Sequence, residues 1–165
     1  MVKNGHFVSP SKGKLTFEQM LSEITQFVAE DTGNFYRLVI GTDSQIKHVG
    51  STSHTYFVTA IVIHRSGRGA RYFWKEKKIT KVPVLRDKIY RETMLSLETT
   101  EELVPKLRRA ISSAKYDLEI HIDVGSRGPT REMIKEVVGM VNGYGYIAKT
   151  KPESWGASSV ADKHT

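Results

Sequence analysis

The stretch Tyr36–Gln45, read as YRLVIGTDSQ, constrains the fold most, because an apolar run leads directly into an acid and a polar segment. The aliphatic centre of this stretch favours a buried strand, since branched apolar side chains fit a pleated surface. Side chains alternate along a strand, so Val39, Gly41 and Asp43 share one face. The pattern therefore predicts a central strand that ends in a carboxylate beside its own core residues.

A second stretch, Leu118–Gly125 (LEIHIDVG), has the same design. Its apolar residues point to one face of the expected strand, and its polar residues Glu119, His121 and Asp123 point to the other. Two buried strands that each end in an aspartate predict a paired-carboxylate site, with Asp43 and Asp123 at one edge of a sheet.

The N-terminal part of the chain divides into two segments. Residues 1–15 are polar and are expected to form a flexible arm. Residues 16–31 are expected to form the N-terminal helix, because Thr16 and Gln19 make a capping box ahead of an apolar stripe at helical spacing. Gly33 suits the end of that helix.

The middle of the chain predicts a meander followed by two helices. A polar loop is expected at 44–53, a second strand at Thr55–His64 and a third at Arg71–Ile79, and short turns make such strands antiparallel neighbours. Helices are expected at 84–99 and 100–110. They are expected to be separate, because Pro105 suits a first turn better than a helix interior.

The last third predicts a strand–helix–strand unit with parallel strands, at 118–124, Arg131–Asn142 and Tyr144–Lys149. A short final helix is expected from Ala157. Together the elements predict an α/β fold in one domain over residues 1–165, with a mixed five-stranded sheet, helices on both faces and an extra N-terminal helix.

Composition excludes several classes of protein. Hydrophobic residues make up 39% of the 165-residue chain, enough for one core, and no cysteine is present for disulfides or thiolate zinc sites. No apolar signal core or membrane-spanning run is present, so a cytoplasmic protein without membrane contact is expected. Neither a P-loop nor a nucleophile-elbow pattern occurs.

The net charge of +7 favours a polyanionic partner, nucleic acid first. Between Arg71 and Arg91 there are eight basic and two acidic residues, so this window holds six of the seven net charges. The candidates for contacts with a phosphate backbone are Lys75, Lys77, Lys78 and Arg91. A solvated face is the alternative reading of the same charges.

Glu92 is the candidate for a third carboxylate. It lies in the stripe Leu85, Ile89, Glu92 and Ser96 on the first of the two expected helices. A carboxylate in a core-facing stripe is costly unless it is paired or bound to metal. Glu98 on the same helix replaces Glu92 if the helix is rotated, and His121 is a secondary candidate for proton transfer or phosphate contact.

The order of these elements, with the runs IGTDSQ, RETMLSL, IHIDVG and ADK, resembles the RNase H-like fold. The stretches GTDSQ, HIDVG and KPESWGASSVADKHT are more narrowly similar to the YkuK family, bacterial proteins described as RNase H-related nucleases. The resemblance implies that Asp43, Glu92, Asp123 and Asp162 are both catalytic and metal-binding, with two Mg²⁺ or Mn²⁺ ions. It also implies hydrolysis of phosphodiester bonds in RNA, RNA–DNA hybrid or structured DNA.

The residues leave alternatives open. Each aspartate taken alone can instead organise a turn or start a helix. A non-catalytic nucleic-acid-binding module with the same fold is therefore the alternative function. The residues do not distinguish among the three substrates or between endo- and exonuclease action, and they do not indicate an oligomeric state.

Overall fold

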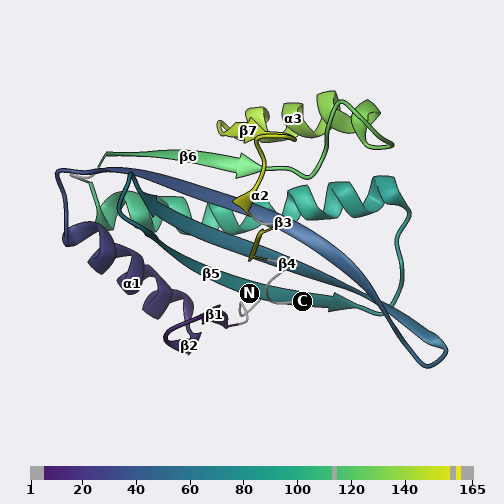
Figure 1. Cartoon of the computed structure of the whole chain (residues 1–165), viewed down its shortest axis with the longest axis horizontal. Helices are drawn as coiled ribbons and strands as arrows, with labels where there is room; N and C mark the ends of the chain where they lie inside the picture. Colours follow the sequence, from purple (N-terminus) through teal and green to yellow (C-terminus); the bar gives the residue numbers. More distant parts are fainter. Residues whose placement is uncertain (1–5, 113–114, 157–158, 161–165) are drawn as a thin grey trace.

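A computed structural model describes residues 6–112, 115–156 and 159–160, and it shows a seven-stranded mixed sheet in the order β2-β1-β5-β4-β3-β6-β7 (Figure 1). The strands are β1 Phe7–Ser9, β2 Gly13–Leu15, β3 Phe35–Val49, β4 Thr52–Arg65, β5 Ala70–Ile79, β6 Lys115–His121 and β7 Ile147–Lys149. The helices are α1 Phe17–Ala29, α2 Leu85–Ala110 and α3 Ile134–Gly143, and a 3-10 turn, Arg131–Met133, precedes α3. Among the described residues, no helix has the length and apolar character needed to span a bilayer.

Strand β3 joins the antiparallel part of the sheet to the parallel part. It pairs antiparallel with β4 from Tyr36↔Arg65 to Val49↔Thr52, and parallel with β6 from Phe35 to Gly41. Strand β4 pairs antiparallel with β5, and β6 pairs parallel with β7. The predicted meander and the predicted parallel strand–helix–strand unit are thus confirmed.

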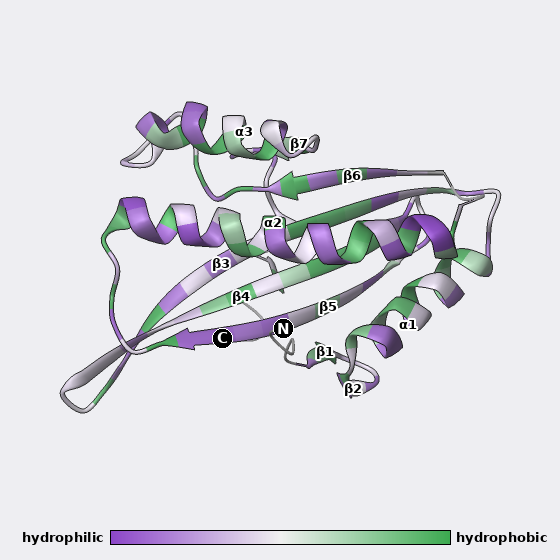
Figure 2. Cartoon of the chain, turned by 180° about the vertical axis from the view of Figure 1, so that it is seen from behind, coloured by the Kyte–Doolittle hydropathy of each residue, from purple (hydrophilic) through white to green (hydrophobic). Residues whose placement is uncertain are grey.

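The main core lies on one face of the sheet, between β3 and the helices. Leu38 and Ile40 are fully buried there with residues of α1 and α2, while the next cluster joins α2, α3 and β6. Figure 2 shows α1 and α2 crossing this face. The chain steps from β3 to β6 to β7 in one direction, and crossovers of one hand then leave their helices on the same face.

The prediction of helices on both faces is confirmed in part. Helices α1, α2 and α3 lie on the core side. The other face carries Val39, Ala60 and Val62, which pack against Val160, and Gly156, Ser159 and Val160 of this C-terminal segment are helical. The expected alternation along β3 is correct, because Val39 lies on the opposite side from Leu38 and Ile40.

The predicted flexible arm is wrong for residues 7–15, which form the β1–β2 hairpin. Val8 pairs with Trp74 of β5, so the hairpin extends the sheet at that edge. Phe7 is fully buried, with its ring centroid 6.3 Å from that of Phe17. Two short strands with a single buried aromatic show no periodicity in the sequence, and tertiary packing supplies most of their stability.

The expected loop at 44–53 is instead the continuation of β3 and β4 into a long hairpin (Figure 1). Polar residues predict a loop, yet they also suit a two-stranded ribbon that is open to water on its sides. The turn lies at Gly50, whose φ of 63° is in the left-handed region that glycine adopts without strain.

The two predicted helices are one continuous helix, α2, with Pro105 inside it. Proline removes one backbone hydrogen bond. Pro105 and Glu101, the residue four positions earlier, are both exposed, so water can satisfy the carbonyl that loses its partner. Burial of Leu103, Val104 and Leu107 on the opposite side holds the helix to the core.

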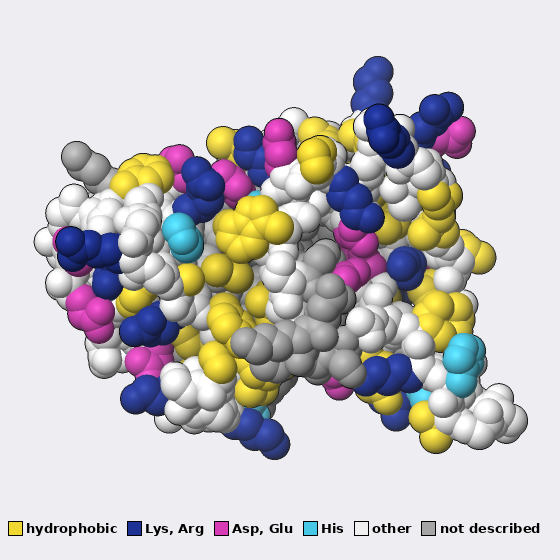
Figure 3. All heavy atoms as spheres, in the orientation of Figure 1, with side chains coloured by type: hydrophobic (Ala, Val, Ile, Leu, Met, Phe, Trp, Pro, Cys, Tyr) yellow, Lys and Arg dark blue, Asp and Glu magenta, His cyan; other side chains and the backbone are white. Residues whose placement is uncertain are grey.

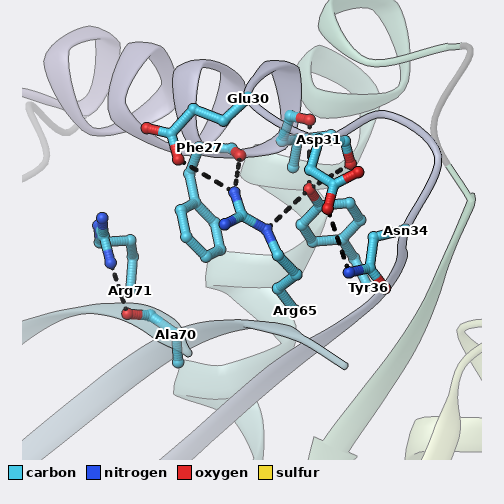
Figure 4. A network of polar contacts seen from close by, with 9 residues as sticks. Phe27, Glu30, Asp31, Asn34, Tyr36, Arg65, Ala70 and Arg71 are labelled. Carbon is cyan, nitrogen blue, oxygen red and sulfur yellow. Dashed lines mark hydrogen bonds and ion pairs between the residues drawn. The ribbon is translucent and has the colours of Figure 1, made fainter. Parts of the chain in front are cut away.

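Helix α1 is fastened to the sheet by a polar network around Arg65 and Tyr36 (Figure 4). The Arg65 guanidinium donates to the carbonyl of Phe27 (2.6 Å), to Glu30 (3.1 Å) and to the Tyr36 hydroxyl (3.1 Å). The Tyr36 hydroxyl in turn donates to the carbonyl of Asp31 at 2.7 Å. The network therefore satisfies carbonyls at the C-terminal end of α1, which have no partner within the helix.

Replacing Tyr36 by Phe removes this hydroxyl and leaves buried partners unpaired. We expect the free energy of unfolding to fall by about 1–2 kcal/mol, measured by urea denaturation. Tyr144→Phe is the control, because Tyr144 is 48% exposed. Equal denaturation midpoints for the Tyr36 variant and the wild type would show that the network does not stabilise the fold.

Candidate functional site

The parallel pairing of β3 with β6 brings Asp43 and Asp123 to neighbouring positions. Gly41 pairs with His121 at the last rung, and each aspartate lies two residues further along its own chain segment. Asp43 is not at a strand end as predicted, since β3 continues to Val49. It lies instead where β3 loses β6 as a neighbour, so the sheet opens beside it.

Glu92 reaches the same region from α2. Ser96 and Glu92 lie about one helical turn apart on α2, and each contacts β3. Ser96 Oγ lies 2.8 Å from Thr42 Oγ1. Ser44 Oγ donates to Glu92 Oε2 at 2.5 Å. The Glu92 side chain is only 3% exposed, whereas Glu98 is exposed and lines a groove on the far side of α2. The helix phase thus turns Glu92, and not Glu98, toward β3.

Burial raises the pKa of Glu92 to about 8, because desolvation disfavours the ionised carboxylate. The hydrogen bond from Ser44 and the charge of Lys88, whose Nζ is 4.0 Å away, act in the opposite direction. The negative charges of Asp43 and Asp123 raise this pKa further. The three carboxylates, from β3, α2 and the segment after β6, therefore interact electrostatically.

Lys151 joins these carboxylates, although the sequence analysis did not select it. Its Nζ lies 2.8 Å from Asp123 Oδ1, and its pKa is raised, first by that hydrogen bond and also by the charges of Asp43 and Glu92. The expected strand order already pointed to a contact between the segments that contain Lys151 and Asp123. Strands β6 and β7 are parallel, so residues that follow β7 lie beside residues that follow β6.

The chemistry of the carboxylates suits a divalent cation, because hard cations bind oxygen ligands. Burial disfavours the ionised form of Glu92, and a nearby positive charge favours it. Within residues 6–112, 115–156 and 159–160, however, no three His, Cys, Asp or Glu side chains are close enough to hold a metal ion. Asp162, the predicted fourth ligand, lies outside the described residues.

His121, the secondary candidate, is engaged on both sides of its ring. Its Nδ1 accepts the backbone N–H groups of Trp155 and Gly156, each at 3.1 Å, and its Nε2 lies 3.1 Å from a carboxylate oxygen of Glu119. Burial lowers the pKa of His121, with Glu119 opposing this. These contacts give the neutral ring with its proton on Nε2. The ring therefore anchors the C-terminal segment to the sheet.

The four predicted nucleic-acid contacts do not form one patch. Lys77 and Arg91 line an open groove of about 710 Å³ between the end of β5 and α2. Lys75 packs on the same side, 5.2 Å from the centre of the Phe7 ring, and burial lowers its pKa despite Glu102 and Glu98.

Lys78 lies on the opposite face, the one that carries Asp43. Its Nζ is 5.9 Å from the centre of the Tyr56 ring, and Lys47 Nζ is 4.9 Å from the same ring. On the face seen in Figure 3, a small group of acidic side chains lies near the centre with basic side chains beside it.

Comparison with known proteins identifies the family to which the chain belongs. The ribonuclease H-like family profile matches residues 19–165, and the chain therefore belongs to that family. The chain is also similar to the uncharacterized protein YkuK of Bacillus subtilis (strain 168), with 32% identity over 169 residues and 96% of each chain covered. This confirms the resemblance drawn from the sequence motifs. No solved structure matches the chain.

The raised pKa of Glu92 predicts how the stability of the protein depends on pH in metal-free buffer. An ordinary glutamate loses its proton near pH 4.5, but folded Glu92 keeps it up to about pH 8. The free energy of unfolding therefore falls as pH rises through this window. We expect the Glu92→Gln variant to gain stability over the wild type between pH 5 and 8, on the order of 3–5 kcal/mol.

Urea denaturation across this pH range measures the difference. Glu98→Gln is the control on the same helix, because it makes the same substitution at an exposed side chain. A constant difference for the Glu92 variant would contradict the raised pKa.

The docking of the C-terminal segment makes a second prediction. A Cβ atom on Gly156 would lie 2.6 Å from Val39 Cγ1. We expect Gly156→Ala to cost about 1–3 kcal/mol of stability through overpacking, and to cost clearly less in a Val39→Ala background. Gly139→Ala is the control, since its Cβ would meet nothing within 4 Å. Equal costs in both backgrounds would contradict this docking.

Proposed function

We propose that this chain hydrolyses phosphodiester bonds of nucleic acid in a divalent-cation-dependent reaction at Asp43, Glu92 and Asp123. The observation that supports this most directly is the burial of Glu92 beside two further carboxylates. Such an arrangement is unfavourable for folding alone, since a buried carboxylate without a cation is costly. Membership of the ribonuclease H-like family supports a function connected with nucleic acid.

The roles of the side chains follow from their positions. Asp43, on the open part of β3, and Asp123, after β6, would supply carboxylate oxygens at the opening of the sheet, while Glu92 would supply a buried oxygen from α2. Ser44 orients the Glu92 carboxylate through its short hydrogen bond. A bound divalent ion would act as a Lewis acid toward the phosphate and lower the pKa of an attacking water. Asp162 is a further proposed ligand.

The charges of the surrounding face fit a phosphate backbone. Lys78 on β5 is two strands away from Asp43 on β3, and it is displaced by two residues along the strand direction. Standard sheet spacings then give a distance of roughly 12 Å between the two Cα atoms. Lys78 and Lys47 flank Tyr56 on this face. We propose that a nucleic-acid strand follows this direction, with lysines near its phosphates. Lys77 and Arg91 would contact a more distant part.

A second candidate function is a nucleic-acid-binding module without catalysis. The ion pair between Lys151 and Asp123 favours it, because that carboxylate already has a counter-charge. The two functions differ in whether the carboxylates are needed for cleavage or only for the local charge balance.

Replacing Asp43 by Asn tests the proposal. The amide keeps an oxygen that can accept the backbone N–H of Ser44, as Oδ1 does at 2.9 Å, so folding should be retained. We expect cleavage to fall by at least about 100-fold, the scale on which a lost metal-site contact reduces activity. The measurement is Mg²⁺- or Mn²⁺-dependent cleavage of labelled RNA, DNA and hybrid duplexes.

Asp117→Asn is the matched control, since Asp117 is an exposed residue of β6 paired opposite Arg37, far along the strand from Gly41. It should cleave like the wild type. Full cleavage by the Asp43 variant would reject the catalytic site. Binding of the same substrates with no cleavage by any variant would favour the non-catalytic module.

A further inference from the structure

The backbone holds Lys151 in a fixed place beside the carboxylates. Its N–H donates to the carbonyl of Val124 at 2.8 Å, which continues the pairing of the two chain segments beyond Lys149, the last residue of β7. Gly125 leaves room for the lysine stem, because a Cβ on Gly125 would lie 3.0 Å from Lys151 Cβ. The ammonium therefore reaches Asp123 from an anchored position.

The Lys151 ammonium can bind a second anion while it keeps Asp123. Its Nζ lies 2.8 Å from Asp123 Oδ1, and the lysine side chain is 55% exposed. An ammonium group has three donors, so one carboxylate contact leaves donors for another acceptor. An ion pair this open to water contributes little to stability. Fold stability alone therefore does not explain why the chain holds a lysine here.

Cations lie on both sides of the carboxylates on this face of the sheet. Lys149 pairs with His121, and Lys151 follows two residues later. Both lysines therefore share the face of Asp123. Lys78 lies on the same face, on the other side of β3 and four strands away from β7. Standard sheet spacings give roughly 20 Å between the Cα atoms of Lys78 and Lys151.

We propose that a nucleic-acid strand crosses this face from β5 to β7, and that Lys151 binds the phosphate on the β7 side of the carboxylates. This inference rests on the proposed function and gives the substrate a direction across the site. A phosphate chain is repelled by carboxylates, and cations on both sides of them offset that repulsion. Lys78 supplies the contact on one side, and Lys151 supplies the contact on the other. Lys151 is then a substrate-binding residue, and Asp123 orients its ammonium.

The test is the affinity of the full chain for short labelled RNA and DNA strands. Fluorescence anisotropy measures it in EDTA, so that no cleavage occurs, from about 50 to 200 mM salt. We expect Lys151→Met to weaken binding at least about threefold, and to reduce the slope of affinity against salt by about 0.7, the share of one phosphate contact. Lys151→Arg keeps the charge and should bind like the wild type. If Lys151→Met does not fold, Lys151→Gln replaces it.

Two controls isolate the contact. Lys106→Met removes the same charge from another exposed ion pair, since Lys106 Nζ lies 3.0 Å from Glu18 on α1, and it should leave affinity unchanged. Asp123→Asn removes the negative charge beside Lys151 but keeps the lysine. In that background, Lys151→Met is expected to weaken binding to the same extent, because the lost contact is with the phosphate. Combining Lys78→Met with Lys151→Met should lower the salt slope by the sum of the two single effects.

The outcomes separate this inference from the proposed function. Unchanged affinity in Lys151→Met, or an effect that disappears in the Asp123→Asn background, would overturn the phosphate contact and leave a nuclease at the carboxylates intact. An effect of Lys151→Met with none of Lys78→Met would overturn the crossing from β5 to β7. No binding of any strand by the wild type at the lowest salt would overturn both this inference and the proposed function.

Discussion

The parallel pairing of β3 with β6 is the interaction on which the rest of the structure depends. Through Leu38 and Ile40 it places the core face under α1 and α2, and through its last rung at Gly41 it places Asp43 beside Asp123. The same pairing ends where β6 ends, while β3 continues into the long hairpin. The sheet thus opens at the point where the carboxylates meet, and the open edge gives a ligand access to them.

Packing around the site offsets the free-energy cost of burying the Glu92 carboxylate. Glu92 occupies a helix position that an apolar residue would fill at lower free energy, and its raised pKa expresses that cost. Ser44, Ser96 and Thr42 provide hydroxyl partners between α2 and β3, so the polar part of this interface is satisfied. A local conflict with core packing of this kind is typical of functional positions. It links the stability of the fold to the cation that the site is proposed to bind.

Some features of this arrangement could be predicted from the residues, and others could not. The alternation along β3, the capping box of α1 and the inward phase of Glu92 follow from local periodicity, and the structure has all three. The β1–β2 hairpin was missed because its strands are three residues each and depend on β5. The continuity of α2 through Pro105 was missed because buried neighbours outweigh the local preference of proline. Lys151 was missed because its partner lies 28 positions earlier in the chain.

The sequence by itself determined helix α1, the meander of β3, β4 and β5, the β6–α3–β7 unit, the two aspartates that follow apolar strand residues and the family to which the chain belongs, because these depend on side-chain periodicity and short motifs. Only the tertiary structure decided which charges meet. The register between β3 and β6 selects Asp43 and Asp123 as neighbours, and the order β6–β7 brings Lys151 to them. The basic residues were separated by the same means, since Lys77 and Lys78 are adjacent in sequence but lie on opposite faces of β5. Electrostatic interactions depend on distance in space, and strand pairing sets that distance.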